Sequence, residues 1–135
     1  MRKAFQVENS RLSVNKNNPF ANVAMEAAYS AGAPWLEAAI SYLERNVDLV
    51  RDSLRDIPGI ELVEPEGTFL IWVNFNGLGL EPNELDDFLR NKAGWSVTRG
   101  HSFGKQGDGF ARVNIACTRA RLEAALDSLK LAVCG

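Results

Sequence analysis

The residue whose type and setting best suit binding chemistry is Arg112, in the stretch from Gly109 to Arg119. Small apolar residues alternate there with other residues in period two, which is typical of a strand with one buried face. The inward set is Ala111, Val113, Ile115 and Cys117, and the outward set is Phe110, Arg112, Asn114 and Ala116. An arginine held on a strand presents a planar fork of N–H donors, which suits bidentate binding of a carboxylate. The pattern leaves open a second interpretation, in which Arg112 pairs with an Asp or Glu at the sheet surface.

Other residues that are capable of chemistry carry weaker signals. The glycine-rich loop at residues 100–109 lacks the lysine-plus-hydroxyl ending of a P-loop and leads into a strand, so we interpret it as an ordinary loop. His101, the only histidine, is expected to be a solvated residue of that loop. Cys117 and Cys134 lack the spacing of a metal site, and Cys117 is expected to be buried and inert. We therefore assign no catalytic, cofactor-binding or metal-binding residue.

Several charged residues are interpreted as surface positions. Arg119 and Arg121 fall in the first turn of the last predicted helix, where the helix dipole slightly disfavours positive charge. Such a position is consistent with a ligand or a domain contact, but we expect both side chains to lie at the surface. Glu64 and Glu66 flank a turn proline and are expected to be solvated.

Length, composition and charge limit the classes of protein that this chain can belong to. The 135 residues are 46% hydrophobic, which is enough to form one domain with a core. A net charge of −2 with mixed signs argues against a nucleic-acid partner, which requires a basic surface. No apolar run is long enough to span a bilayer, and the first residues lack the apolar centre of an export signal. We therefore expect a cytoplasmic protein with reduced thiols.

The elements that must position Arg112 follow from the periodicity of the sequence. Residues 1–17 are expected to be an irregular connecting segment, and residues 18–135 a single domain. Asn18 and Pro19 predict a helix start, and further helices are predicted at residues 34–57, 82–93 and 119–133. Short strands are predicted at residues 60–63, 68–75 and 95–98 and around Arg112.

These elements indicate an α+β fold with a small, mostly antiparallel sheet that is covered on one face by helices. In the strand at residues 68–75, Phe69, Ile71, Val73 and Phe75 form the inner face. Leu70 and Trp72 make the outer face apolar too, so we expect something outside these residues to cover it. The helix at residues 34–57 would be roughly 35 Å long, which suggests that it also reaches a second body.

Three stretches of the sequence resemble the fold-type-I pyridoxal-phosphate (PLP) enzymes. The first runs from Asn18-Pro19-Phe20 through Ala27-Ala28-Tyr29 and Gly32-Ala33-Pro34-Trp35-Leu36 to Tyr42-Leu43 and Asn46. The second is Pro65–Trp72, and the third is Phe103-Gly104 with Gly107 and Gly109–Cys117. The branch that they most resemble is that of the cystathionine β-lyase-like C–S lyases and aminotransferases of the MalY/PatB type. The resemblance extends from Asn18 to Val133 and corresponds to the C-terminal small domain of those enzymes.

The resemblance implies a role for Arg112 and a place for this chain within a larger enzyme. Arg112 would bind the α-carboxylate of an amino-acid substrate, and a large PLP-binding domain, absent here, would pack beside the sheet. A homodimer is implied as well. The Schiff-base lysine of the family lies upstream of this region, and Lys3, Lys16, Lys92, Lys105 and Lys130 sit in none of its expected contexts. The resemblance thus implies PLP in the full-length enzyme, none bound to this chain, and a chain that is inactive alone.

Two other functions stay open at this point. One is a freestanding module that binds a small molecule or a protein and reuses this domain without catalysis. The other is a regulatory domain that senses a free amino acid through Arg112.

The residue Arg99 stands where the family often has proline, which leaves the geometry of the following loop open.

Overall fold

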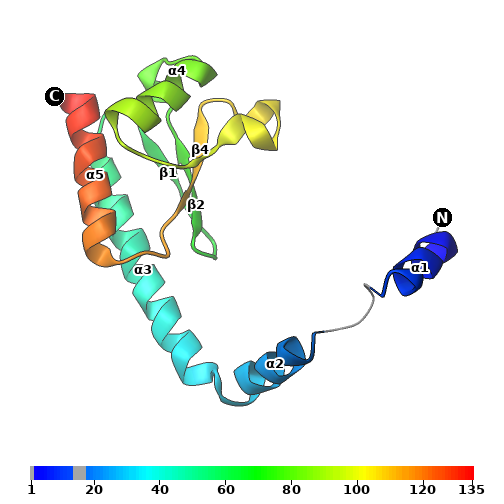
Figure 1. The fold of residues 1–135 in the computed structure, drawn as a ribbon. Helices are drawn as coiled ribbons and strands as arrows, with labels where there is room; N and C mark the ends of the chain where they lie inside the picture. Colours follow the sequence, from blue (N-terminus) through cyan, green and yellow to red (C-terminus); the bar gives the residue numbers. More distant parts are fainter. Residues whose placement is uncertain (1, 14–17) are drawn as a thin grey trace. The chain divides into compact units, whose positions relative to one another are not determined.

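The structure is a computed structural model that describes residues 2–13 and 18–135. The chain divides into two units, Met1–Ala39 and Ile40–Gly135, and each is described by itself. Helix α3, Ala33–Arg55, begins in the first unit and continues in the second. The second unit contains the sheet and the helices that pack on it (Figure 1).

Within the described residues, the sheet has four strands in the order β1–β2–β4–β3, and neighbouring strands are antiparallel. The strands are β1 at Glu61–Val63, β2 at Leu70–Asn74, β3 at Thr98–Arg99 and β4 at Phe110–Asn114. The register places Trp72 of β2 and Thr98 of β3 on either side of Arg112. The predicted α+β class with a small antiparallel sheet is confirmed.

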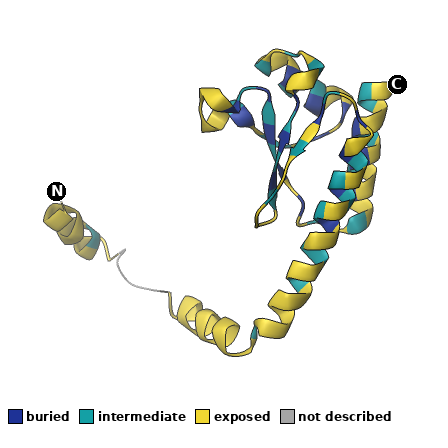
Figure 2. Ribbon diagram, turned by 180° about the vertical axis from the view of Figure 1, so that it is seen from behind, coloured by how far each residue is buried: buried dark blue, intermediate teal, exposed yellow. Residues whose placement is uncertain are grey.

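Helices α3 and α5 cover one face of this sheet and enclose the core (Figure 2). Helix α5 spans Arg119–Cys134, and a shorter helix, α4 at Pro82–Asp87, continues into a π-helical turn, η2 at Phe88–Lys92. The buried side chains of α3 and α5 meet those of the central strands: Val50, Leu54, Leu122, Leu126, Leu129, Ile71, Val73, Ala111 and Val113. The periodicity of three and four in both helices predicted these core positions.

A buried polar contact ties helix α3 to the end of strand β4. Asn46 is fully buried, and its Nδ2 donates to the carbonyl oxygens of Ile115 at 2.8 Å and Cys117 at 3.3 Å. The hydroxyl of Tyr42 donates to the same Cys117 carbonyl at 3.2 Å. Helix α3 therefore supplies hydrogen-bond donors for two carbonyls of the backbone that leaves β4.

Two of the predicted strand positions differ in the structure. Phe69 is 41% exposed and lies outside β2, because Thr68 adopts a left-handed φ of 66° that interrupts the extended backbone just before it. Trp95 precedes β3 and is buried instead against α5, where its Nε1 donates to the carbonyl of Ala125 at 2.8 Å. The predicted strand at residues 95–98 is thus reduced to the two residues of β3.

The first unit contains helix α1 at Arg2–Arg11, where the sequence predicted an irregular connection. The guanidinium of Arg11 donates to Glu8 Oε1 from Nε at 3.1 Å and from Nη2 at 2.6 Å, an i,i+3 pair that favours a helical turn. Residues 14–17 of the predicted connection lie outside the described residues. The boundary between residues 17 and 18 stays a prediction.

Helix α2, Pro19–Ala31, starts as the sequence predicts. The Oδ1 of Asn18 accepts a hydrogen bond from the backbone N–H of Phe20 at 3.0 Å, and Pro19 occupies the first turn. Large apolar side chains of α2 and of the first turns of α3 are exposed: Phe20, Val23, Met25, Tyr29, Trp35, Leu36 and Ile40. Across residues 2–13 and 18–135, none of the helices is long and apolar enough to cross a membrane.

Arg51 of α3 pairs with two carboxylates on the surface of the second unit. Its Nη1 lies 2.6 Å from Asp48 Oδ1, and its Nε and Nη2 both donate to Glu64, which follows β1. Glu64 is exposed as predicted, but it is ion-paired rather than simply solvated. The guanidinium of Arg51 lowers the pKa of the Glu64 carboxyl below its ordinary value.

The Arg51→Gln variant is expected to raise the pKa of Glu64 towards its ordinary value, because the hydrogen bonds to the charged form are lost. The stabilisation by this pair is present above the unfolded-state pKa of Glu64 and is lost as the pH falls through its lowered folded-state pKa. The effect on stability is small because both side chains are exposed. An NMR titration of the Glu64 carboxyl measures the shift. Arg55→Gln, which removes only a pair with Asp52, should leave it unchanged; an unaltered midpoint in Arg51→Gln would contradict the prediction.

Candidate functional site

Arg112 lies at the centre of the sheet, on the face opposite to α3 and α5. Strand β4 has β2 on one side and β3 on the other, and its neighbours Ala111 and Val113 are 1% and 8% exposed. Arg112 itself is half-buried and points away from that core, as the period-two pattern predicts. The guanidinium is thus carried by a strand that is fixed on both edges.

The contacts of Arg112 are made with neutral groups. Its Nη2 donates to Thr98 Oγ1 at 3.4 Å, which is long for a hydrogen bond, and its Cζ lies 4.8 Å from the centroid of the Phe103 ring. Among residues 2–13 and 18–135, no carboxylate oxygen lies within 4.0 Å of its guanidinium nitrogens. The interpretation of Arg112 as half of a structural ion pair is therefore not supported within the described chain.

Three aromatic residues share the outer face of the sheet with this arginine. The Trp72 ring meets the Phe103 ring edge-on at 5.5 Å and stacks on Phe110 at 5.7 Å. We call Trp72, Thr98, Phe103, Phe110 and Arg112 the Arg112 face. Trp72, whose outer side was expected to need an external cover, is covered in part by the chain's own Phe103. Thr98 and Phe103 were not predicted from the sequence, because the strand register and the loop path that bring them to Arg112 leave no periodic signal.

The glycine-rich loop before β4 folds back on itself beside this face. It contains two short 3₁₀ helices, η3 at Gly100–Phe103 and η4 at Lys105–Gly107. A Cβ on Gly100 would lie 2.1 Å from the carbonyl oxygen of Gly107, and one on Gly107 would lie 2.1 Å from that of Gly100. These two glycines thus allow a close approach of backbone to backbone, which accounts for them without a phosphate ligand.

Arg99 anchors the start of this loop from the edge strand. Its Nε lies 3.0 Å from Oδ2 of Asp86 on α4, and the Asp86 side chain is only 14% exposed. The backbone carbonyl of Arg99 also accepts a hydrogen bond from Ser102 Oγ at 2.6 Å. Arg99 therefore holds the start of the loop whose geometry the sequence left open. His101, which was expected to be a solvated loop residue, is a half-buried residue of η3.

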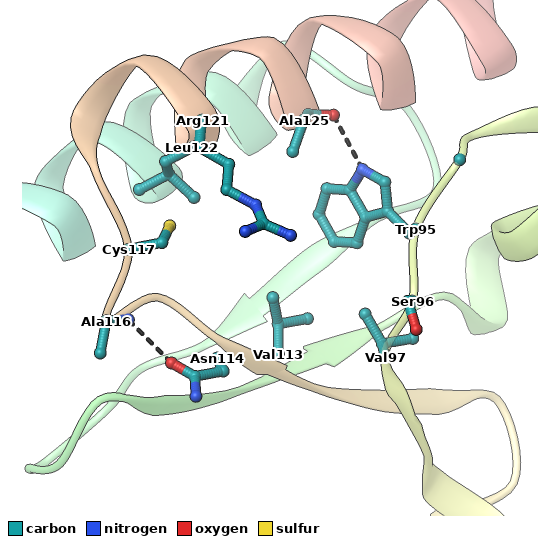
Figure 3. A pocket seen from close by; sticks show the side chains of 11 residues that line it. Trp95, Ser96, Val97, Val113, Asn114, Ala116, Cys117, Arg121, Leu122 and Ala125 are labelled. Carbon is teal, nitrogen blue, oxygen red and sulfur yellow. Dashed lines mark hydrogen bonds between the residues drawn. The ribbon is translucent and has the colours of Figure 1, made fainter.

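A pocket of about 380 Å³ lies on the other side of the sheet, between the end of β4, residues 94–97 and the first turns of α5 (Figure 3). The exposed side chain of Arg121 projects into it, and Cys117 and Trp95 form part of its wall. Arg112 does not line this pocket; its neighbour Val113 does. The two arginines thus face opposite sides of the sheet and do not converge on one ligand.

The remaining candidates have structural positions. Arg119 Nη1 donates to the carbonyl of Arg45 at 2.8 Å, so this arginine braces α5 on α3 rather than standing free at the surface. Cys117 was expected to be buried on the core face, but it is half-buried: it lies three residues beyond the end of β4, and the last fully buried residue of the alternating pattern is Ile115. Cys117 and Cys134 are free thiols. Within the described residues, no cluster of three or more His, Cys, Asp or Glu could hold a metal ion.

Comparison with known proteins gives consistent relatives, although no protein-family model matches the chain. The cystathionine β-lyase PatB of Bacillus subtilis is 34% identical over 133 residues, which cover 98% of this chain and 34% of the relative. A solved PLP-bound protein from Clostridium difficile 630 is 39% identical with a TM-score of 0.88. The match covers 98% of this chain and 34% of the chain of that protein. Cystalysin from Treponema denticola, solved with pyridoxal 5′-phosphate, is 28% identical with a TM-score of 0.81. The match covers 85% of this chain and 29% of the cystalysin chain. The chain therefore spans about a third of the length of the relatives it matches.

Proposed function

Because the chain belongs to the family of PLP-dependent aminotransferases and cystathionine β-lyase-like C–S lyases, as their C-terminal small domain, we propose that Arg112 binds the α-carboxylate of an amino-acid substrate. The observation that carries this proposal is the setting of the guanidinium: half-buried on a central strand and, within the described residues, without an acidic partner. A bidentate guanidinium–carboxylate pair is both strong and directional. It would hold the substrate in one orientation for transamination or β-elimination.

We propose that this chain does not by itself form the site for the cofactor. PLP requires a lysine that forms a Schiff base, and such lysines are activated in desolvated surroundings or beside another cation. The lysines that the structure describes, Lys3, Lys92, Lys105 and Lys130, are all exposed. Bound PLP supplies an electron sink for a carbanion at the substrate's Cα. We assign its lysine and the groups that hold its ring to the part of the enzyme that this chain does not span.

The exposed apolar residues of the first unit support the proposal of a larger assembly. Helix α2 and the first turns of α3 leave Phe20, Tyr29 and Trp35 81%, 90% and 75% exposed. Apolar surface of this extent marks a contact with another body. We propose that these helices pack against the large PLP-binding domain and that the complete enzyme is a homodimer.

The test is to add PLP to this chain, reduce with borohydride and map any lysine adduct by mass spectrometry. The expected result is no stoichiometric adduct and no amino-acid turnover, because each described lysine is solvated. In the complete enzyme the same treatment should label one lysine outside these 135 residues. A single stoichiometric adduct within this chain, together with turnover, would contradict the proposal. Binding of a free amino acid by the chain without any such adduct would instead support a regulatory domain.

A further inference from the structure

We propose that Phe103 and Thr98 are positioning residues that orient the Arg112 guanidinium for the substrate carboxylate. This inference rests on the proposed function and names two groups that act through Arg112. Neither residue needs to touch the reacting atoms. Each makes a measured contact with the guanidinium, and the two contacts are of different chemical kinds.

Thr98 restrains one end of the guanidinium from the edge strand. It is the register partner of Arg112 across the β3–β4 pair, so its side chain lies on the same face of the sheet. Its Oγ1 accepts a hydrogen bond from Arg112 Nη2 at 3.4 Å, a weak bond that nevertheless favours one rotation of the planar group. Four of the five N–H donors of an arginine stay unused by this contact.

Phe103 restrains the guanidinium from above the sheet. Cζ of Arg112 lies over the Phe103 ring at 4.8 Å from its centroid, within the range of a cation–π interaction. Such a contact is made with the face of the ring and consumes no N–H donor. Together, the two contacts limit the motion of the charged group while they leave its donors free for a carboxylate, which lowers the entropy lost on binding.

Phe103 can do this because its own position is restrained, even though the side chain is 54% exposed. Its ring meets Trp72 edge-on at an angle of 79°, and Trp72 in turn stacks on Phe110 of β4. The backbone of η3 is held by the bond from Ser102 to Arg99 and by the close approach of Gly100 to Gly107. The ring is thus fixed to the same strands that carry Arg112.

The first test is made on the 135-residue chain by NMR of the Arg112 Nε–Hε group. Phe103→Leu is expected to remove the contribution of the Phe103 ring to the chemical shift of this signal and to speed rotation about the Nε–Cζ bond, while Phe103→Tyr preserves both. Phe20→Leu, the same change at a residue that is 81% exposed, is the matched control. Thermal unfolding of each variant checks that the fold is intact. An unchanged Arg112 signal in a folded Phe103→Leu variant would overturn the proposal.

The second test is made on the complete enzyme and separates this inference from the proposed function. Phe103→Leu and Thr98→Val are each expected to raise KM for the amino acid about two- to five-fold with little change in kcat. Thr98→Ser, which keeps the hydroxyl, should restore the lower KM. If Arg112→Lys leaves KM unchanged, the proposed function fails. If Arg112→Lys raises KM but neither positioning variant does, only the present inference fails.

Discussion

The Asn46→Ala variant is expected to lower the free energy of unfolding by about 2–4 kcal/mol. Asn46 is fully buried, and its Nδ2 donates to the carbonyl of Ile115. The same nitrogen also donates to the carbonyl of Cys117, which accepts a bond from Tyr42 as well. Alanine would leave the Ile115 carbonyl without its side-chain donor and would open a small cavity between α3 and β4. Urea unfolding followed by circular dichroism measures the change. Asn83→Ala, at an exposed position of α4, is the matched control and should be close to neutral.

The Asn46→Asp variant distinguishes loss of the donor from loss of volume. The carboxylate has nearly the same shape, but at neutral pH it cannot donate to either carbonyl. Burial should raise the pKa of the introduced carboxyl in the folded state, so the destabilisation grows as the pH rises above its unfolded-state pKa of about 3.9. Below that pKa the protonated group can donate again, and stability should recover. A variant equally stable at pH 4 and pH 7 would contradict this account of Asn46.

The Arg112→Lys variant of the complete enzyme is expected to lose about 100-fold in kcat/KM, or about 3 kcal/mol. Lysine keeps the charge but replaces a fixed fork of donors with a flexible point charge, so bidentate geometry is lost. The contact exists in the bound ground state and persists during reaction, so most of the loss should fall on KM. Steady-state kinetics with an amino acid and with the corresponding amine should show that the penalty applies only to the substrate that carries a carboxylate.

Arg121→Lys is the matched control for that experiment. Arg121 is exposed and projects into the pocket on the opposite side of the sheet, so the same change there should leave KM unaltered. Equal losses in both variants would indicate a general effect of replacing an arginine, such as a loss of stability, rather than a carboxylate site at Arg112. A wild-type KM in Arg112→Lys would refute the proposed role of Arg112.

Two features of the structure connect these predictions. Arg112 is three residues before Ile115, whose carbonyl Asn46 holds, and the same strand pairs with β2 and β3 around the arginine. Damage to the Asn46 contact is therefore expected to act first on stability, and on substrate binding only through the position of β4. Arg112→Lys is expected to do the opposite: it should weaken substrate binding and change stability little, because the side chain of Arg112 lies outside the core.

Local patterns in the sequence were sufficient for most of the elements and for the direction in which Arg112 points. Period two on β4, the steps of three and four on α3 and α5, and the Asn18-Pro19 helix start are properties of neighbouring residues, so they can be read without a fold. Helix α1 was missed because its sequence is polar and buries no apolar stripe, which removes the signal on which such a prediction depends.

The surroundings of Arg112 were decided only by the tertiary structure. Trp72, Thr98 and Phe103 come from three separate segments, and they meet because of the strand register and because two glycines let the loop fold back. The same is true of Asn46, whose carbonyl partners lie 69 and 71 residues away in sequence. Periodicity reports which side of an element is buried, because that depends on local geometry. Which distant group completes a contact depends on how the elements pack, and the sequence pattern carries no record of it.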